Sequence, residues 1–134
     1  MVPPRIPAGL LGIPFLSRGS DADGCDCWGL VVLASRTLWG AEVPRYEGYA
    51  EANSDGIADW IRERWGAWDN IPPGEERAGD VAAFAIHCAA PVHVGLVVAR
   101  GWMVHVMPGR DSCLERYDRP YWRSTLARFG RLLP

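Results

Sequence analysis

The sequence predicts one α+β domain in which helices precede strands. Two patterns carry this prediction. Apolar residues recur at helical spacing between Asp26 and Trp39, and they alternate with a period of two between Asp80 and Met107. The chain has 134 residues, of which 49% are hydrophobic, and this is enough for a single domain with its own apolar core.

The N-terminal part is rich in proline and glycine up to residue 24, which predicts an extended arm with one short helical turn near Ala8–Leu11. A long helix is expected over Asp26–Trp39. Asp26 is a favourable N-cap because its carboxylate accepts hydrogen bonds from the first turn, and Gly40 is a typical helix stop.

Further along, a loop at 41–54 leads to a second expected helix, Asp55–Trp65, and then to a turn-rich link at 66–78. The period-two pattern predicts three strands, Asp80–Ile86, Val92–Val98 and Trp102–Met107. The segment Leu114–Phe129 is mixed and is expected to hold a strand and a short helix. The domain thus divides into an arm at 1–20, a core at 21–107 and a C-terminal segment at 108–134.

Composition excludes several classes of protein. The net charge is −2, with 14 basic residues, all arginine, so a protein that tracks nucleic-acid phosphates is not expected. The apolar runs are far shorter than the ~18 residues of a membrane span, so no membrane insertion is expected. Pro14 interrupts the apolar stretch near the start, which predicts synthesis in the bacterial cytoplasm without a signal peptide.

The four cysteines are Cys25, Cys27, Cys88 and Cys113. A chain of this size does not need a disulfide framework, and Cys25 and Cys27 are awkwardly spaced for a mutual bridge. The chain has neither a C-x-x-C motif nor a histidine pair at helical spacing, so no zinc module is predicted.

Cys27 stands at the expected start of the helix. The helix dipole and the unpaired backbone N–H groups of the first turn stabilise a thiolate, which is the form of cysteine that attacks carbonyl groups. Gly29 keeps the adjacent turn free of a side chain, and the same N–H groups are candidates to hold an oxyanion. Taken alone, this local signal favours Cys27 as a small buried apolar residue, because buried cysteines are common.

Two histidines are candidate partners for this thiol. His93 lies inside one predicted strand and His105 inside the next, whereas His87 is expected in a solvent-facing loop. A three-residue hairpin loop with Gly101 as a bulge residue places His93 directly opposite His105 on one face of the sheet. A two-residue turn at Arg100–Gly101 instead places them on opposite faces.

Four blocks occur in order along the chain: Gly24–Val31 around Cys27, Arg77–Phe84, His93–Leu96 and Val104–His105. They follow the pattern D-C-x-G-[LV], G-D-[LV]-x-x-F, H-V-G-[IL] and [IV]-H over about residues 9–107. In this the sequence resembles the NlpC family of papain-like cysteine peptidases, which act on bacterial cell walls. Trp28 and the stretch Val43–Tyr46 resemble the branch of this family found in phage tails and gene-transfer-agent particles.

The resemblance implies an α+β, papain-like fold in which the helix with the nucleophile packs on a mainly antiparallel sheet that carries both histidines. Cys27 matches the nucleophile, His93 the base and His105 the third polar residue of a Cys-His-His triad. The implied reaction is hydrolysis of an amide bond in peptidoglycan stem peptides, typically beside D-glutamate and diaminopimelate, without a metal or other cofactor.

The sequence departs from the family at Phe15, where many members carry a tyrosine whose hydroxyl supports the oxyanion or the substrate. Loss of one oxyanion donor costs about 10²–10³ in rate where that donor acts. Backbone N–H groups at Cys27 and Trp28 are the remaining candidates. Trp28 is expected either to line the substrate cleft or to pack under the arm at 9–20, and Asp26 and Asp80 are interpreted as structural.

The leading hypothesis is a thiol-dependent peptidoglycan endopeptidase that acts from a phage-like tail or gene-transfer-agent particle during cell-wall penetration. Its expected partners are stem peptides and tail-hub or baseplate proteins. A second hypothesis is a structural tail-tip or baseplate component with a vestigial site, motivated by Phe15 and by the aromatic and arginine-rich segment Tyr117–Arg123. Acyl transfer by the same residues is a third, and a zinc module is the least favoured.

Overall fold

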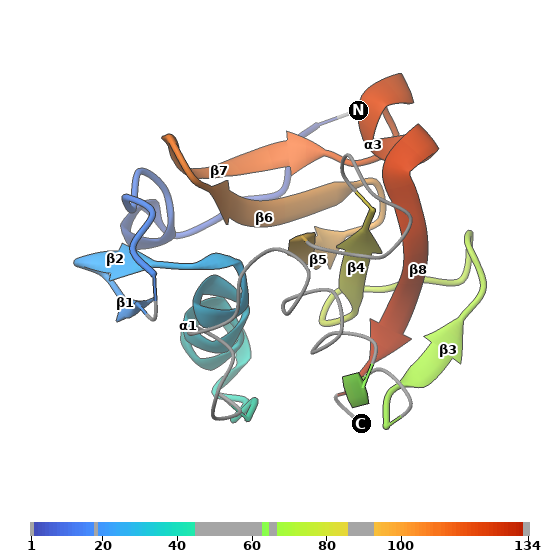
Figure 1. Cartoon of the computed structure of the whole chain (residues 1–134), viewed down its shortest axis with the longest axis horizontal. Coiled ribbons are helices and arrows are strands. Elements are labelled where there is room, and N and C mark those ends of the chain that lie inside the picture. Colours follow the sequence, from blue (N-terminus) through green and yellow to red (C-terminus); the bar gives the residue numbers. More distant parts are fainter. Residues whose placement is uncertain (1, 18, 45–62, 65–66, 86–92, 133–134) are drawn as a thin grey trace.

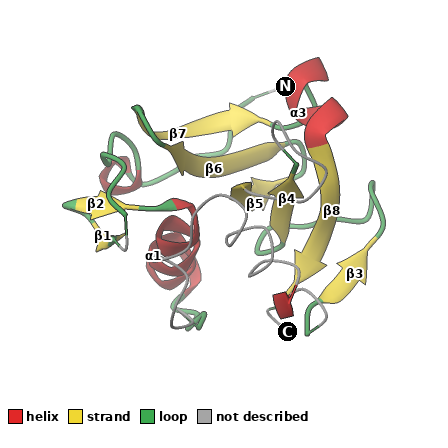
Figure 2. Ribbon diagram, in the orientation of Figure 1, coloured by secondary structure: helices red, strands yellow, loops and turns green. Residues whose placement is uncertain are grey.

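The computed structural model describes residues 2–17, 19–44, 63–64, 67–85 and 93–132 (Figure 1). Helix α1 lies beside a sheet that is built from the second half of the chain (Figure 2). The helices whose bounds lie within the described residues are η1 (Ala8–Leu10), α1 (Cys27–Trp39) and α3 (Pro120–Thr125). None of the helices in the described part of the chain combines the length and the apolar character that crossing a membrane requires.

A six-stranded sheet with antiparallel pairing is the centre of the fold, in the order β3-β8-β4-β5-β6-β7. Its strands are β3 (Asp69–Ile71), β4 (Val81–Phe84), β5 (His93–Ala99), β6 (Trp102–Met107), β7 (Arg110–Arg116) and β8 (Leu126–Arg131). The mixed helix-and-sheet architecture confirms the predicted α+β class. The predicted helix over 55–65 lies largely outside the described residues, and so do His87 and Cys88.

Helix α1 forms where the sequence predicts it. The Asp26 side chain accepts a hydrogen bond of 2.6 Å from the backbone N–H of Gly29, which caps the first turn. Gly40 ends the helix in the left-handed conformation, with a φ of 64°, and its N–H bonds to the carbonyl of Arg36. Both ends of this helix are therefore determined by local chemistry.

Two hydrophobic clusters cover the two faces of the sheet. The first, which we call the α1 cluster, joins apolar residues of α1 to alternate residues of the central strands, among them Val94, Leu96, Val104 and Val106. The second, which we call the Trp122 cluster, joins Trp122 of α3 to residues of the same strands whose side chains point to the other face, such as Val97 and Met103. Because successive side chains of a strand point to opposite faces, the sheet separates the two clusters.

The β5–β6 hairpin decides which face the histidines share. Ala99 pairs with Trp102 around a two-residue turn, but the register shifts between Val97 and Ala99, so that Val97 pairs with Met103. The two-residue turn alone would place residues 93 and 105 on opposite faces of the sheet. The extra residue of the bulge reverses this, so that both lie on the same face. The expected direct pairing of His93 with His105 is wrong. The register that pairs Leu96 with Val104 places Gly95 opposite His105, and His93 therefore lies diagonally across from His105.

The N-terminal arm contains the expected helical turn as η1, and it also contains a hairpin that the sequence analysis did not predict. Strands β1 (Ser20–Asp21) and β2 (Gly24–Cys25) pair with each other just before α1. The arm is fastened to β7 through Ser112, whose backbone and hydroxyl bond to Leu10, Gly12 and Ile13.

Two further segments differ from the prediction. The link at 66–78 contains strand β3, which exists because it pairs with β8, some 60 residues later in the chain. Asp80 precedes β4 and is 1% exposed, and both of its carboxylate oxygens accept hydrogen bonds from Arg131 of β8 at 2.8 and 2.9 Å. This buried ion pair gives Asp80 the structural role that the sequence analysis assigned to it.

Candidate active site

Cys27 is the first residue of α1 and is 7% exposed. Its backbone follows the capping residue Asp26, so the sulfur is attached where the helix dipole is positive and first-turn N–H groups are not used within the helix. Cys27 packs in the α1 cluster. The position has the local features that stabilise a thiolate.

The two aromatic residues predicted near the cleft take part in packing. Trp28 is 1% exposed, its ring stacks on Trp68 at 5.5 Å, and its indole N–H donates to the carbonyl of Pro44 at 2.8 Å. Phe15 is half-buried, forms a parallel bridge with Cys25 and packs against the α1 cluster. In this structure Trp28 is therefore an interior side chain.

The two histidines meet on the face of the Trp122 cluster. His93 Nε2 and His105 Nδ1 are 2.9 Å apart, and the two side chains are 5% and 1% exposed. Both rings lie against Trp122, at centroid distances of 5.6 and 5.0 Å. A Cβ at Gly95 would lie 2.6 Å from the sulfur of Met103 and 3.4 Å from Cβ of His105, so a side chain there would require Met103 to shift.

Glu115 extends this pair into a chain of three groups. Its Oε1 is 2.8 Å from His105 Nε2. Although burial alone would raise the pKa of Glu115, its hydrogen bonds with Trp122 and His105 lower it, so Glu115 is a carboxylate at neutral pH. Sequence analysis missed Glu115 because it lies on β7, which pairs with β6 through contacts that local periodicity does not reveal.

Burial governs the charge of both imidazoles. Desolvation, with smaller contributions from His105 and Arg110, lowers the pKa of His93 to about 3. Burial also lowers the pKa of His105, although the Glu115 carboxylate acts in the opposite direction. Both rings are therefore neutral at pH 7, and each carries one proton on one nitrogen.

The Glu115 carboxylate, at the end of this row of hydrogen-bonded groups, fixes which ring nitrogens carry those protons. A carboxylate only accepts, so His105 carries its proton on Nε2 and donates it to Glu115. His105 Nδ1 is then an acceptor, and His93 donates to it from Nε2. The Nδ1 atom of His93 is left with an unprotonated lone pair, which is the requirement for a general base.

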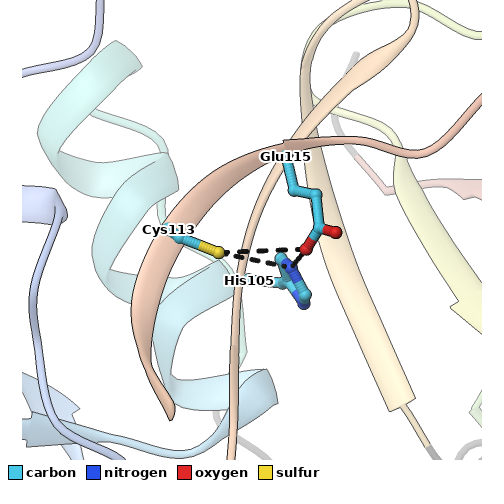
Figure 3. Close-up of side chains that lie close together, drawn as sticks. All are labelled: His105, Cys113 and Glu115. Atoms are coloured by element: carbon cyan, nitrogen blue, oxygen red, sulfur yellow. Dashed lines mark hydrogen bonds and ion pairs between the residues drawn. The ribbon is translucent and has the colours of Figure 1, made fainter. Parts of the chain in front are cut away.

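A second cysteine lies beside the hydrogen-bonded groups of His105 and Glu115. Cys113 pairs with His105 across β6 and β7, and its sulfur is 3.6 Å from His105 Nε2 (Figure 3). Burial, followed by the negative charge of Glu115, raises the pKa of the Cys113 thiol. This environment disfavours a thiolate at Cys113 in the absence of a cation.

The structure brings together two of the predicted catalytic residues, because His93 and His105 contact each other and Trp122. Cys27 belongs to the α1 cluster, together with Val94 and Leu96, which alternate with His93 along β5.

Comparison with known proteins assigns the family. The model of the NlpC/P60 family matches residues 12–131, which is nearly the whole chain and includes α1, both histidines and Glu115. The chain belongs to the NlpC/P60 family. A search among curated protein sequences found no match to this NlpC/P60 chain.

Solved structures share the fold of this NlpC/P60 domain. One is an NlpC/P60 family protein from Bacillus cereus, with a TM-score of 0.66 and 21% identity over 92% of this chain and 37% of that one. A lipoprotein-like NLP/P60 protein from Staphylococcus aureus has a TM-score of 0.65 and 18% identity over 95% of this chain and 39% of its own. The present chain therefore spans less than half the length of both proteins.

The NlpC/p60 domain of the peptidoglycan hydrolase SagA is similar over almost its full length. It has a TM-score of 0.60 and 18% identity, and the match covers 92% of this chain and 90% of that one. At these identities the similarity establishes the papain-like NlpC/P60 fold.

Proposed function

We propose that this NlpC/P60 domain is a thiol-dependent endopeptidase that hydrolyses peptide bonds in peptidoglycan stem peptides. Family membership over residues 12–131 supports the proposal, together with a fold shared with the peptidoglycan hydrolase SagA. The observation that carries it is the buried chain from His93 through His105 to Glu115, because this arrangement prepares a neutral imidazole with a free lone pair.

In the proposed mechanism, His93 Nδ1 takes the proton from the Cys27 thiol, and the thiolate attacks the peptide carbonyl. Backbone N–H groups at the start of α1 receive the negative charge on the carbonyl oxygen. His93 returns its proton to the leaving amine, and water hydrolyses the acyl-enzyme. His105 holds the ring of His93, and Glu115 holds the ring of His105.

These steps require the Cys27 sulfur and His93 Nδ1 to come within hydrogen-bond distance. The dependence of cleavage on the Cys27 thiol is therefore the property to measure. We expect purified protein to release new amino termini from peptidoglycan fragments, and iodoacetamide to abolish that release while alkylating Cys27. Mass spectrometry identifies both the products and the modified cysteine. Release that continues after Cys27 is fully alkylated would contradict the proposal.

The exposed ring of Tyr121, in the aromatic and arginine-rich segment Tyr117–Arg123, favours a second candidate function. The domain would then serve as a structural component of a phage-like tail tip or baseplate, with contacts through this segment. Under either function we propose that the protein acts from such a particle. Copurification with tail proteins, without cleavage of peptidoglycan and without selective alkylation of Cys27, would favour the structural role.

We expect a Glu115→Gln variant to lower kcat for stem-peptide cleavage by about 10²-fold with little change in KM. The amide of glutamine can donate to His105 Nε2, which moves the His105 proton to Nδ1 and the His93 proton off Nε2. Nitrogen-15 NMR of the histidine rings reports this change of tautomer directly.

The matched control is Glu42→Gln, which removes a carboxylate that is 75% exposed and pairs with Arg36 on the surface. This control is expected to leave both the tautomers and kcat unchanged, because exposed ion pairs of this kind contribute little. Unchanged histidine tautomers in Glu115→Gln would show that Glu115 does not position the pair.

A further inference from the structure

His105, Cys113 and Glu115 place three metal-binding atoms around one point (Figure 3). The distance from Nε2 of His105 is 3.6 Å to Sγ of Cys113 and 2.8 Å to Oε1 of Glu115, and the sulfur and the oxygen are 4.0 Å apart. Zinc bonds of ~2.0–2.3 Å in tetrahedral geometry place neighbouring ligand atoms roughly 3.2–3.6 Å apart. Shifts of about half an ångström would therefore complete a zinc-sized triangle.

The sheet builds this triangle rigidly. His105 and Cys113 are cross-strand partners, and Glu115 follows two residues later on the same face of β7. His105 is 1% exposed and is held by Trp122, whereas Glu115 is 33% exposed and opens the triangle toward solvent. A nitrogen, a thiolate sulfur and a carboxylate oxygen are the ligand types that zinc takes, and three protein ligands leave one position open.

His93 supplies the support that a metal-bound histidine normally has. The nitrogen of His105 that faces away from the triangle is 2.9 Å from His93 Nε2. A ligating histidine almost always donates its other ring N–H to a second group, which fixes the orientation of the ring. A cation on Nε2 would make Nδ1 of His105 the donor in this hydrogen bond.

Arg110 is the group that opposes a cation here. Its Nη2 is 3.5 Å from the Glu115 carboxylate and 3.7 Å from the Cys113 sulfur. Its side chain is 54% exposed, so it can turn into solvent when a dication takes its place. Its ion pair with Glu115 is the contact that a bound dication has to replace.

We propose that His105, Cys113 and Glu115 form a zinc site that controls the histidine pair. Binding releases the Cys113 thiol proton to solvent and moves the proton of His105 from Nε2 to Nδ1. The proton of His93 moves from Nε2 to Nδ1, so both rings stay neutral. His93 Nδ1 then carries a proton and has no lone pair to accept one from Cys27, so bound zinc inhibits peptide cleavage. This inhibition rests on the proposed function, whereas the binding of zinc does not.

The test uses reduced, untagged full-length protein and Co²⁺ as the spectroscopic probe, with Zn²⁺ as the competitor. We expect wild type to show the near-ultraviolet thiolate–Co²⁺ band and tetrahedral visible bands, both removed by Zn²⁺. Cys113→Ser removes the thiolate band and weakens binding at least about 100-fold, and Glu115→Gln weakens it about tenfold or more. Arg110→Ala strengthens binding.

The matched control is Cys25→Ser, which changes a buried thiol that bonds to the carbonyl of Asp21, away from the triangle. It is expected to keep the wild-type spectrum. Absence of the thiolate band in wild type, or its persistence in Cys113→Ser, would overturn the site. If Co²⁺ binds as described but the protein has no peptidase activity, the site stands and the proposed function fails. If the protein cleaves equally fast with and without bound Zn²⁺, the inhibitory role is wrong.

Discussion

A Cys27→Ala variant is expected to cleave stem peptides on the order of 10⁴–10⁶-fold more slowly than wild type, because loss of the nucleophile leaves only binding and oxyanion stabilisation. The substitution removes one sulfur atom from the start of α1 and keeps a good helix former there. Circular dichroism therefore checks that the fold persists, and single-turnover assays with peptidoglycan fragments measure the loss.

Two other cysteines make this test decisive. Cys25→Ser lies two residues away at a position that is also buried, keeps a donor for the carbonyl of Asp21 and is expected to cleave like wild type. Cys113→Ser removes the thiol that the structure places 3.6 Å from His105. If Cys113→Ser loses cleavage while Cys27→Ala retains it, Cys113 is the nucleophile and the assignment by family pattern is wrong.

A Gly29→Ala variant is expected to destabilise the fold by about 3 kcal/mol or more. A Cβ at this position would lie 1.8 Å from the carbonyl oxygen of Gly19 and 2.9 Å from the carboxylate of Asp26. The Gly19 oxygen accepts the backbone N–H of Asp26, and the carboxylate caps the helix. Relief of the clash would therefore break the contacts that fix the start of α1.

Urea unfolding followed by circular dichroism measures this loss. Gly9→Ala is the matched control, since a Cβ there has nothing within 4 Å. It is expected to change the unfolding free energy by no more than about 0.5 kcal/mol. A Gly29→Ala variant as stable as Gly9→Ala would mean that the arm does not pack on the helix start as described.

The elements that the sequence predicts correctly are those with local causes. The limits of α1 follow from a capping carboxylate at Asp26 and a left-handed glycine at Gly40, and both act within one turn of the helix end. The strand character of β5 and β6 follows from runs of apolar, often β-branched residues, which the structure buries on both faces of the central hairpin. These signals are contained in short windows of sequence.

Local sequence signals do not predict how His93 and His105 are aligned across the β5–β6 hairpin. Neither a three-residue loop nor a plain two-residue turn places His93 and His105 as the structure does, because the turn is two residues long and a bulge between Val97 and Ala99 restores the shared face. A bulge adds one residue without changing composition, so the pattern of apolar residues does not reveal it. The shared face was predicted, but the diagonal offset was not.

The rest of the candidate site depends on pairing between distant segments. Glu115 and Cys113 meet His105 only because β7 folds back on β6 in one particular register, and Trp122 covers the rings only because α3 follows β7. Metal ligands that come from facing strands leave neither a C-x-x-C motif nor a histidine pair at helical spacing in the sequence. Geometry across a sheet is set by tertiary contacts, which no single segment encodes.

The hydrogen bonds of Ser112 to the N-terminal arm protect this protein from pairing with other copies of itself through the edge of the sheet. Strand β7 ends the sheet, and its outer side would offer free backbone groups to any passing strand. Gly12 donates to the carbonyl of Ser112, and Ser112 donates to the carbonyl of Ile13, so the arm satisfies those groups within the chain. A truncated protein that begins after Ile13 would expose an open template for intermolecular pairing, and its solubility would suffer before its fold did.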